Sequence, residues 1–352
     1  MNIGELGPIQ WSDNLLNGLP LVMLGWPLLA LLRARREGWD RAELLTAALF
    51  LGLALTSQRF LGPMAIACAP YFGRDLDGFV RARRWPPATA GPWARAGLAI
   101  GACAALLPLG WQYLDLRPGI GVAPLHYPRA ACDWIAAHGV RGRSFNQFEQ
   151  GGYLLWRFWP ERTRLPFMDI HQTGTREDRF DYVGAMLDPE EWRALDQRHR
   201  FEWVLLKGLH APTDHCLDHL DADTSFRLVF VDDAAALYLK RHGPLAAIAD
   251  SFGYRFLRAG EVRRLQIGER CVADAAVRAG TERELRRAIA ESPLTSGALS
   301  VLASLLMFED RWPEAREALE RGKRIQPILP LYQERMKMIE DSLGVEGRPP
   351  NR

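Results

Sequence analysis

Long uncharged runs near the N-terminus constrain the fold of this chain most strongly. Residues 14–32 and 96–114 contain no charged side chain, and each run is close to the roughly 20 residues that a helix needs to cross a bilayer. A third apolar region, 44–73, is interrupted only by Arg59 at its centre. Residues 1–117 are therefore predicted to form an α-helical membrane part.

Arginines in the connecting segments predict how often the chain crosses. Four arginines at 33–41 and five at 74–95 flank the region 44–73, and such loops favour the cytoplasmic side. Two cytoplasmic loops require two crossings between them, so a helical hairpin is expected, with Arg59 at its turn. Arg59 is then a candidate ligand for a lipid phosphate or an anchor at the interface. About four transmembrane helices follow, near 14–32, 44–58, 60–73 and 96–114.

The same topology predicts where the rest of the chain lies. The N-terminus and everything after about residue 114 are expected outside the cytoplasm, which in a bacterium is the periplasm. The chain is thus predicted to be a multi-pass inner-membrane protein with the lipid bilayer as a partner. Glu5 and Asp13 precede the first apolar run, which argues against a cleavable signal peptide.

Composition excludes several classes of protein. The net charge of +2 argues against a nucleic-acid partner. No phosphate-binding loop, dinucleotide-binding glycine pattern or nucleophile elbow follows a predicted strand, and no cofactor is predicted. Five cysteines without a CxxC pair indicate buried free thiols rather than a disulfide framework, although Cys132, Cys216 and Cys271 could include one pair in an oxidising compartment.

Short alternating elements after residue 117 predict a mixed α/β domain over 118–243. Two apolar strands, 226–231 and 235–241, are expected to form a hairpin across Asp232 and Asp233. The remaining elements are expected to be helices at 128–139, 149–160 and 187–199, and strands at 143–148, 163–170 and 201–207.

This ordered set of segments resembles a known family. FNQFEQGGYLLWRFWP, RLPFMDIHQTGTR, FEWVLLK and the closing hairpin are similar to the region after the last membrane helices of bacterial C-type glycosyltransferases, which use polyprenyl-phosphate sugars. The segment TSQRFLGPMAIACAP resembles their late transmembrane helices. The resemblance covers roughly 40–241, and nothing in this chain corresponds to the catalytic half. It implies the C-terminal half of such an enzyme, standing alone.

Polar residues gather near the ends of the first two predicted strands, where open α/β sheets place their ligands. In the glycosyltransferases a Gly-Gly-Tyr turn and an Asp at a strand end recur, and Gly151, Gly152, Tyr153 and Asp169 match them. Gly151 and Gly152 could offer backbone N–H groups to a phosphate or sugar oxygen, but a tight turn with positive φ is favoured. The candidate ligand-binding residues are Asn146, Glu149, Gly151, Gly152, Tyr153, Asp169, His171 and Arg176.

His215 and His219 are weak metal candidates. They stand four residues apart on a helix predicted to begin at Asp214, so both can face one ligand. No companion carboxylate pattern accompanies them. A solvated helix face is favoured, and no metal is predicted.

The C-terminal region repeats with a 34-residue offset, which is the tetratricopeptide period. Residues 292–327 resemble one full repeat, and the whole region 273–344 is predicted to form an all-α tetratricopeptide-like C-terminus of one and a half repeats. So few repeats must pack on the α/β domain or on a partner. A peptide-binding groove and a structural cap remain alternatives. Residues 244–272 are expected to be a linker, and the tail 345–352 to be disordered.

Two functions fit this sequence. The first is a non-catalytic accessory protein or half-enzyme in envelope glycan or glycolipid assembly, with a polyprenyl-phosphate sugar or a membrane glycosyltransferase as partner. The second is a membrane-anchored interaction protein whose C-terminal helices recruit a periplasmic protein. No catalytic residue is identified, because the catalytic half of the resembling family has no counterpart here.

Overall fold

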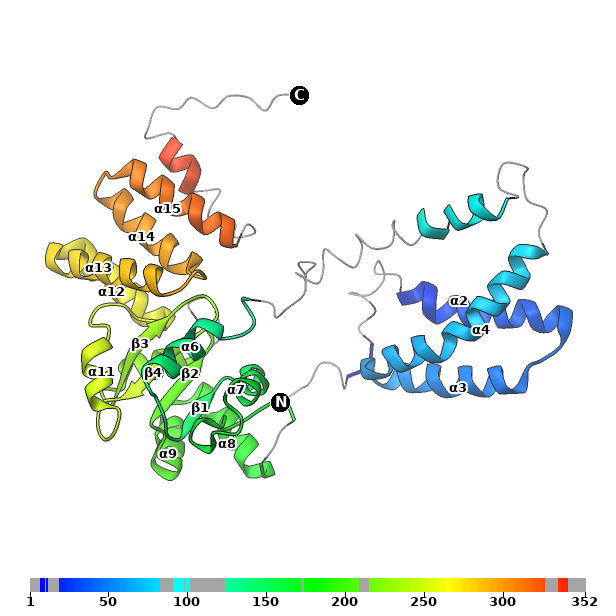
Figure 1. Cartoon of the computed structure of the whole chain (residues 1–352), viewed down its shortest axis with the longest axis horizontal. Coiled ribbons are helices and arrows are strands. Elements are labelled where there is room, and N and C mark those ends of the chain that lie inside the picture. Colours follow the sequence, from blue (N-terminus) through cyan, green and yellow to red (C-terminus); the bar gives the residue numbers. More distant parts are fainter. Residues whose placement is uncertain are drawn as a thin grey trace. The chain divides into compact units, whose positions relative to one another are not determined.

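The computed structural model describes residues 7–9, 11, 19–82, 91–97, 99–101, 124–171, 174–208, 215–326 and 335–340. The chain divides into two compact units, Met1–Gly119 and Ile120–Arg352. Figure 1 shows helices in the first unit, and a sheet with many helices in the second.

Three helices pack against one another in the described part of the first unit. They are α2 (Leu19–Glu37), α3 (Arg41–Thr56) and α4 (Leu61–Arg81), with a short 3₁₀ turn, η2 (Gln58–Phe60), between the last two. Asp40 caps α3 by accepting from the N–H groups of Ala42 and Glu43, as an N-cap carboxylate should. The break between α3 and α4 therefore falls at the place where the sequence predicts a turn.

No helix in the described part of the chain is long and apolar enough to cross a membrane. α3 has 16 residues, or about 24 Å at 1.5 Å per residue, against a hydrocarbon core of about 30 Å. The apolar run of α2 ends at Arg33, and that of α4 ends at Arg74. The predicted membrane spans at 14–32, 44–58 and 60–73 are therefore contradicted.

The predicted inner-membrane location depends on these spans, so it is contradicted as well. A multi-pass inner-membrane protein with a periplasmic soluble part needs the helices that the structure lacks in its described residues. The sequence interpretation counted uncharged residues without regard to where each helix ends, and α3 ends at Thr56, before η2 separates it from α4. Most of the fourth predicted span, 96–114, lies outside the described residues.

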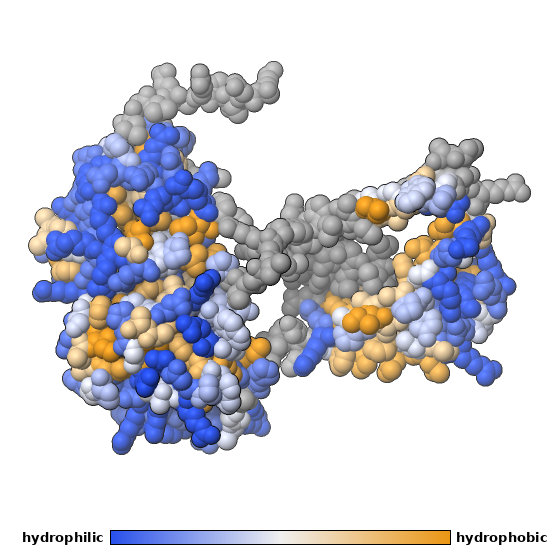
Figure 2. All heavy atoms as spheres, viewed as in Figure 1, coloured by the Kyte–Doolittle hydropathy of each residue, from blue (hydrophilic) through white to orange (hydrophobic). Residues whose placement is uncertain are grey.

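The first unit buries little of its apolar surface. Trp26, Met64 and Cys68 form its core together with small residues of α3. Figure 2 shows apolar residues on the surface along α3, at the lower edge of this unit. Large side chains that are more than half exposed occur on three helices: Leu24 and Leu28 on α2, Leu44, Leu45, Leu49 and Leu55 on α3, and Ile66 on α4. An apolar surface of this extent marks a place where another molecule binds.

The second unit is organised around a four-stranded mixed sheet with strand order β1-β2-β4-β3. The strands are β1 (Ser144–Asn146), β2 (Trp203–Leu206), β3 (Phe226–Val231) and β4 (Ala236–Lys240). β1 runs parallel to β2, and the other neighbours are antiparallel. The predicted mixed sheet and its closing hairpin are thus present.

Both faces of this sheet are buried, which explains its nearly continuous apolar strands. Alternate residues of β2 enter different cores: Val204 and Leu206 face one apolar cluster, and Trp203 and Leu205 face the other. An irregularity in β3 between Leu228 and Phe230 shifts the pairing with β4.

Helices surround the sheet close to the predicted positions. α6 (Arg129–Ala137), α7 (Gly151–Phe158) and α9 (Pro189–His199) fall within expected ranges, and α8 (Arg176–Leu187), α10 (His215–Ala222) and α11 (Ala246–Phe252) complete the set. The predicted strand at 163–170 is not a strand; it begins as a 3₁₀ turn, η5 (Arg162–Arg164), and continues without backbone pairing to β1. Another 3₁₀ turn, η4 (Phe148–Gln150), leads into α7.

The C-terminal helices continue the same core. They are α12 (Glu261–Ala273), α13 (Ala275–Glu291), α14 (Ser296–Phe308) and α15 (Trp312–Ile325). Leu285, Leu302 and Leu319 belong to one apolar cluster with residues of the sheet, so these helices pack on the α/β domain rather than standing apart. The segment 244–272, predicted to be a linker, contains α11 and all but the last residue of α12.

The cysteines of the described region are buried and form no disulfide. They are Cys132, Cys216 and Cys271 in the second unit and Cys68 in the first. Burial raises the pKa of Cys132 to about 12, so this thiol stays protonated near neutral pH.

Candidate functional site

Asn146 is a structural residue rather than an accessible ligand. Its Oδ1 accepts from the N–H groups of Phe167, at 2.7 Å, and Met168, at 3.2 Å, while its Nδ2 donates to Met168 O at 2.8 Å. The side chain is completely buried. The Asn146 side chain therefore supplies the hydrogen bonds that a neighbouring strand would supply. It binds the backbone of residues 167 and 168, in the segment that the sequence predicts to be a strand.

Gly151 is needed for close packing, not for an unusual backbone angle. Its φ of −57° is helical, which contradicts the predicted turn with positive φ. A Cβ at this position would lie 2.2 Å from Met168 O and 2.8 Å from the Cα of Asp169. Gly152 has open space around it, so the two glycines play different parts.

Asp169 and His171 form the one polar pair among the candidate residues. The buried Asp169 carboxylate accepts from His171 N–H at 3.1 Å, and its other oxygen lies 3.2 Å from His171 Nδ1. The His171 side chain is 73% exposed. A carboxylate that holds one imidazole nitrogen leaves the other ring nitrogen directed away from it.

The remaining candidates are divided between the core and the surface. Tyr153 is buried, and its ring packs against Tyr127 and Trp156. Glu149 and Arg176 are exposed, and Arg176 lies over the Phe180 ring. The structure thus brings Asn146, Gly151 and Asp169 together around Met168, but as packing residues.

His215 and His219 belong to no cluster of potential metal ligands among the described residues. Both lie on α10, and burial together with the nearby His215 lowers the pKa of His219. Within the described ranges, no group of three His, Cys, Asp or Glu side chains is placed to hold a metal ion. The predicted helix start at Asp214 lies outside these ranges.

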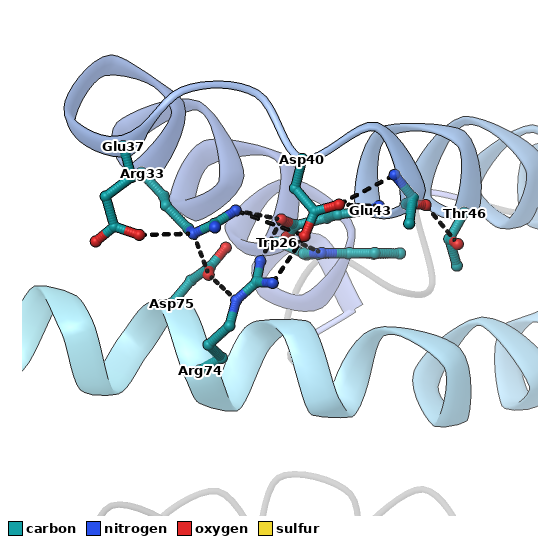
Figure 3. A network of polar contacts seen from close by, with 9 residues as sticks. Trp26, Arg33, Glu37, Asp40, Glu43, Thr46, Arg74 and Asp75 are labelled. Atoms are coloured by element: carbon teal, nitrogen blue, oxygen red, sulfur yellow. Dashed lines mark hydrogen bonds and ion pairs between the residues drawn. The ribbon is translucent and has the colours of Figure 1, made fainter.

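Arg59 is exposed in η2, where no ion pair with another described residue holds it. The arginines that matter structurally in this unit are instead Arg33 and Arg74, which the sequence interpretation assigned to loops. Each lies inside a helix, α2 or α4. Figure 3 shows both pointing into a network of carboxylates.

This network joins α2, α3 and α4. Arg74 reaches Asp40 at 2.9 Å, Glu43 at 2.5 Å and Asp75 at 2.8 Å, and Arg33 pairs with Glu43 and Asp75. Burial and the neighbouring Asp75 carboxyl raise the pKa of Glu43. The sequence interpretation considered only the arginines and so missed the network. The acidic residues at 40, 43 and 75, which lie close to those arginines in the sequence, could have indicated it.

A second missed feature joins the hairpin to the C-terminal helices. Asp233 in the β3–β4 turn accepts from the N–H groups of Ser296, at 2.7 Å, and Gly297, at 2.9 Å, at the start of α14. Asp232 accepts from Ser292 Oγ at 2.7 Å. These contacts fix the helices onto the sheet. α14 itself is buried along most of its length.

The exposed helix of this stack is α12. Its N-terminal N–H groups are held by α10, because Gly260 donates to Asp221 at 2.8 Å and Arg263 donates to Asp218 at 3.2 Å. Val262, Leu265 and Val272 are 53%, 63% and 60% exposed. Spacings of three and seven residues return to nearly the same side of a helix, so these three side chains form an apolar stripe, called here the α12 stripe.

An aromatic residue adjoins the C-terminal end of the α12 stripe. Arg278 of α13 donates to Cys271 O, next to Val272, and its guanidinium lies 5.1 Å from the centre of the Phe308 ring. Phe308 is half exposed. An apolar face on a helix is one of the recurring surfaces through which proteins bind one another.

Comparison with known proteins adds no family to these observations. No family model matches the sequence, and the search of curated proteins found no match. What the chain does is therefore inferred from the contacts of its own residues.

Proposed function

We propose that this protein is an interaction protein that binds a protein partner through its C-terminal helices. The observation that supports this function is the α12 stripe, an exposed apolar row on a helix anchored at its N-terminus by Asp218 and Asp221. The 34-residue offset in the sequence adds support, since tetratricopeptide helices commonly bind proteins. The partner is an apolar helix face or extended segment that covers the stripe.

Photo-crosslinking tests this function directly. A photoreactive residue at Leu265 is expected to crosslink one protein in native extracts, identified by mass spectrometry and confirmed by tagging that protein in turn. The matched control places the same group at Arg321, an exposed position on α15. Crosslinks of equal yield to the same protein from both positions would contradict the assignment.

A double variant provides a second test of this binding surface. Val262→Glu with Leu265→Glu puts charge on the stripe, and both side chains are exposed, so folding should be retained. Capture of the crosslinked partner is expected to fall by roughly tenfold, which corresponds to about 1.4 kcal/mol. Undiminished capture by a folded double variant would remove the stripe as the binding surface.

A second candidate function is an accessory role in envelope glycan assembly beside a polyprenyl-phosphate-sugar glycosyltransferase. The supporting contact is Asp169 holding the exposed His171. His171→Ala is then expected to abolish co-purification with the glycosyltransferase while the α12 double variant keeps it. Point variants are needed because deletion of 273–343 would remove Leu285, Leu302 and Leu319 from the shared core.

A further inference from the structure

A pocket of about 430 Å³ lies at the N-terminal ends of β1 and β2. It is at the opposite end of these strands from the residues that the sequence suggested, and it is separate from the α12 stripe. The charged and aromatic residues that line it are Arg143, Arg162, Phe167, His199, Phe201 and Glu202. Its volume falls in the range of small-molecule sites, about 300 to 1,000 Å³.

Backbone contacts hold the walls of the pocket in place. Arg143 donates its backbone N–H to Glu202 Oε2 at 3.0 Å and its Nη1 to His199 O at 2.9 Å. Arg200 has a left-handed φ of 54° and ends α9, and Phe201 N–H donates to Asp196 at 3.0 Å. The turn between α9 and β2 is therefore fixed before any ligand binds.

His199 carries an unused hydrogen-bonding atom. Its ring packs against Phe167, with ring centres 4.9 Å apart, and against Phe201, at 5.6 Å, and these two rings also contact each other at 5.2 Å. Its Nε2 is buried without a hydrogen-bond partner. Burial, with a smaller contribution from Arg198, lowers the pKa of His199, so the imidazole is neutral at pH 7. A buried polar atom without a partner costs about 1 to 3 kcal/mol, which a ligand hydroxyl would recover.

The charges that line the pocket favour an anion. Arg143 and Arg162 are cationic and Glu202 is anionic, which leaves one positive charge. Arg162 is exposed and forms no ion pair within the part of the chain that the structure describes. A carboxylate matches one surplus positive charge and the planar donors of arginine.

We propose that this pocket binds a hydroxylated monocarboxylate of monosaccharide size, that is, a sugar acid. The carboxylate binds Arg162 and the free donors of Arg143, a hydroxyl satisfies His199 Nε2, and the carbon skeleton packs against Phe167 and Phe201. Because neutral imidazole donates or accepts at Nε2 according to its tautomer, a hydroxyl, which can do either, is the complementary group.

Calorimetric titration of the full chain with D-glucuronate, D-glucose and inorganic phosphate tests the ligand class. D-Glucuronate is expected to bind, and the other two at least roughly tenfold more weakly. Equal binding of D-glucose would show that the arginines make no contribution, and tighter binding of phosphate would overturn the carboxylate assignment. No binding of D-glucuronate would overturn the proposal itself.

Variants and spectroscopy locate the site. Arg162→Ala and His199→Phe are each expected to weaken D-glucuronate binding roughly tenfold, whereas Arg141→Ala, an exposed neighbour that does not line the pocket, leaves it unchanged. In the unaltered protein, the ¹⁵N signal of His199 should shift with ligand while that of His219 does not. A shift confined to His219, or equal binding by all three variants, would refute the site.

Discussion

Gly151 shows how one missing side chain positions a whole segment. The chain passes from η4 into α7 beside the backbone of Met168 and Asp169, and a Cβ has no room there. Asn146 completes the arrangement by bonding the same segment from β1. The residues that resemble a glycosyltransferase loop are therefore held together by packing and by backbone hydrogen bonds.

Gly151→Ala is expected to destabilise the protein by several kcal/mol, because Met168 O or α7 must move to admit a methyl group. Gly152→Ala is the matched control: it adds the same methyl group to the same helix, in open space, and should be neutral or stabilising by up to about 1 kcal/mol. Urea denaturation of both variants measures the difference. Equal stabilities would contradict the packing argument.

At the scale of elements, the β3–β4 turn acts as a joint between sheet and helices. Asp233 caps α14 although it belongs to another element, and Asp232 binds Ser292 and the N–H groups of Ala234 and Ala235. A helix N-terminus favours a nearby carboxylate, since it presents unpaired N–H groups and the positive end of the helix dipole. Two adjacent aspartates thus orient the C-terminal stack.

Asp232 makes stability depend on pH. Burial raises its pKa from 3.8 to about 6 in the folded chain. Between about pH 4 and pH 6, the folded protein keeps a proton that the unfolded chain has released, so the free energy of unfolding falls as pH rises, by roughly 3 kcal/mol. Asp221, whose pKa burial also raises to about 6, acts in the same direction.

Asp232→Asn should reduce this fall, because an amide keeps the acceptor for Ala234 and Ala235 without a titrating proton. Urea denaturation at several pH values between 4 and 7 measures it. Asp250→Asn, at an exposed position on α11, is the control and should behave as the unaltered protein. A variant at Asp232 with an unchanged pH profile would show that another group is responsible.

At the scale of the whole molecule, the two units bury their apolar residues to different extents. The second unit has a core shared by sheet and helices, whereas the first leaves leucines of α2 and α3 exposed around a small core. Its helices are joined by the network of Arg33 and Arg74 instead. A large exposed apolar surface of this kind marks a binding surface.

The full chain is therefore expected to self-associate in aqueous buffer. Replacing Leu45, Leu49 and Ile66 by Gln, which removes three of the largest exposed apolar side chains, should shift the protein toward the monomer in sedimentation velocity. Leu187→Gln, an exposed leucine of the second unit on α8, is the control and should have no effect. If this triple variant self-associates as strongly as the unaltered protein, the surface that mediates self-association lies elsewhere.

The sequence by itself determined the local elements of the second unit. Short, nearly continuous apolar runs located β2, β3 and β4, and cap residues such as Asp188 located α9, because apolar runs and helix caps are patterns of residues close together in the chain. The 34-residue offset likewise indicated the helices after residue 273. The sequence did not reveal α12, since the charged residues of Glu261–Ala273 obscure its apolar stripe.

Only the tertiary structure decided what distant residues do. It showed that Asn146 and Gly151 meet Met168, that Asp233 caps α14, and that Arg33 and Arg74 share carboxylates. It also replaced the predicted membrane spans by helices that are too short or too charged within the described residues. Uncharged runs in a sequence carry no information about where a helix begins and ends, or about which charges fold back upon it, and these long-range contacts set the outcome.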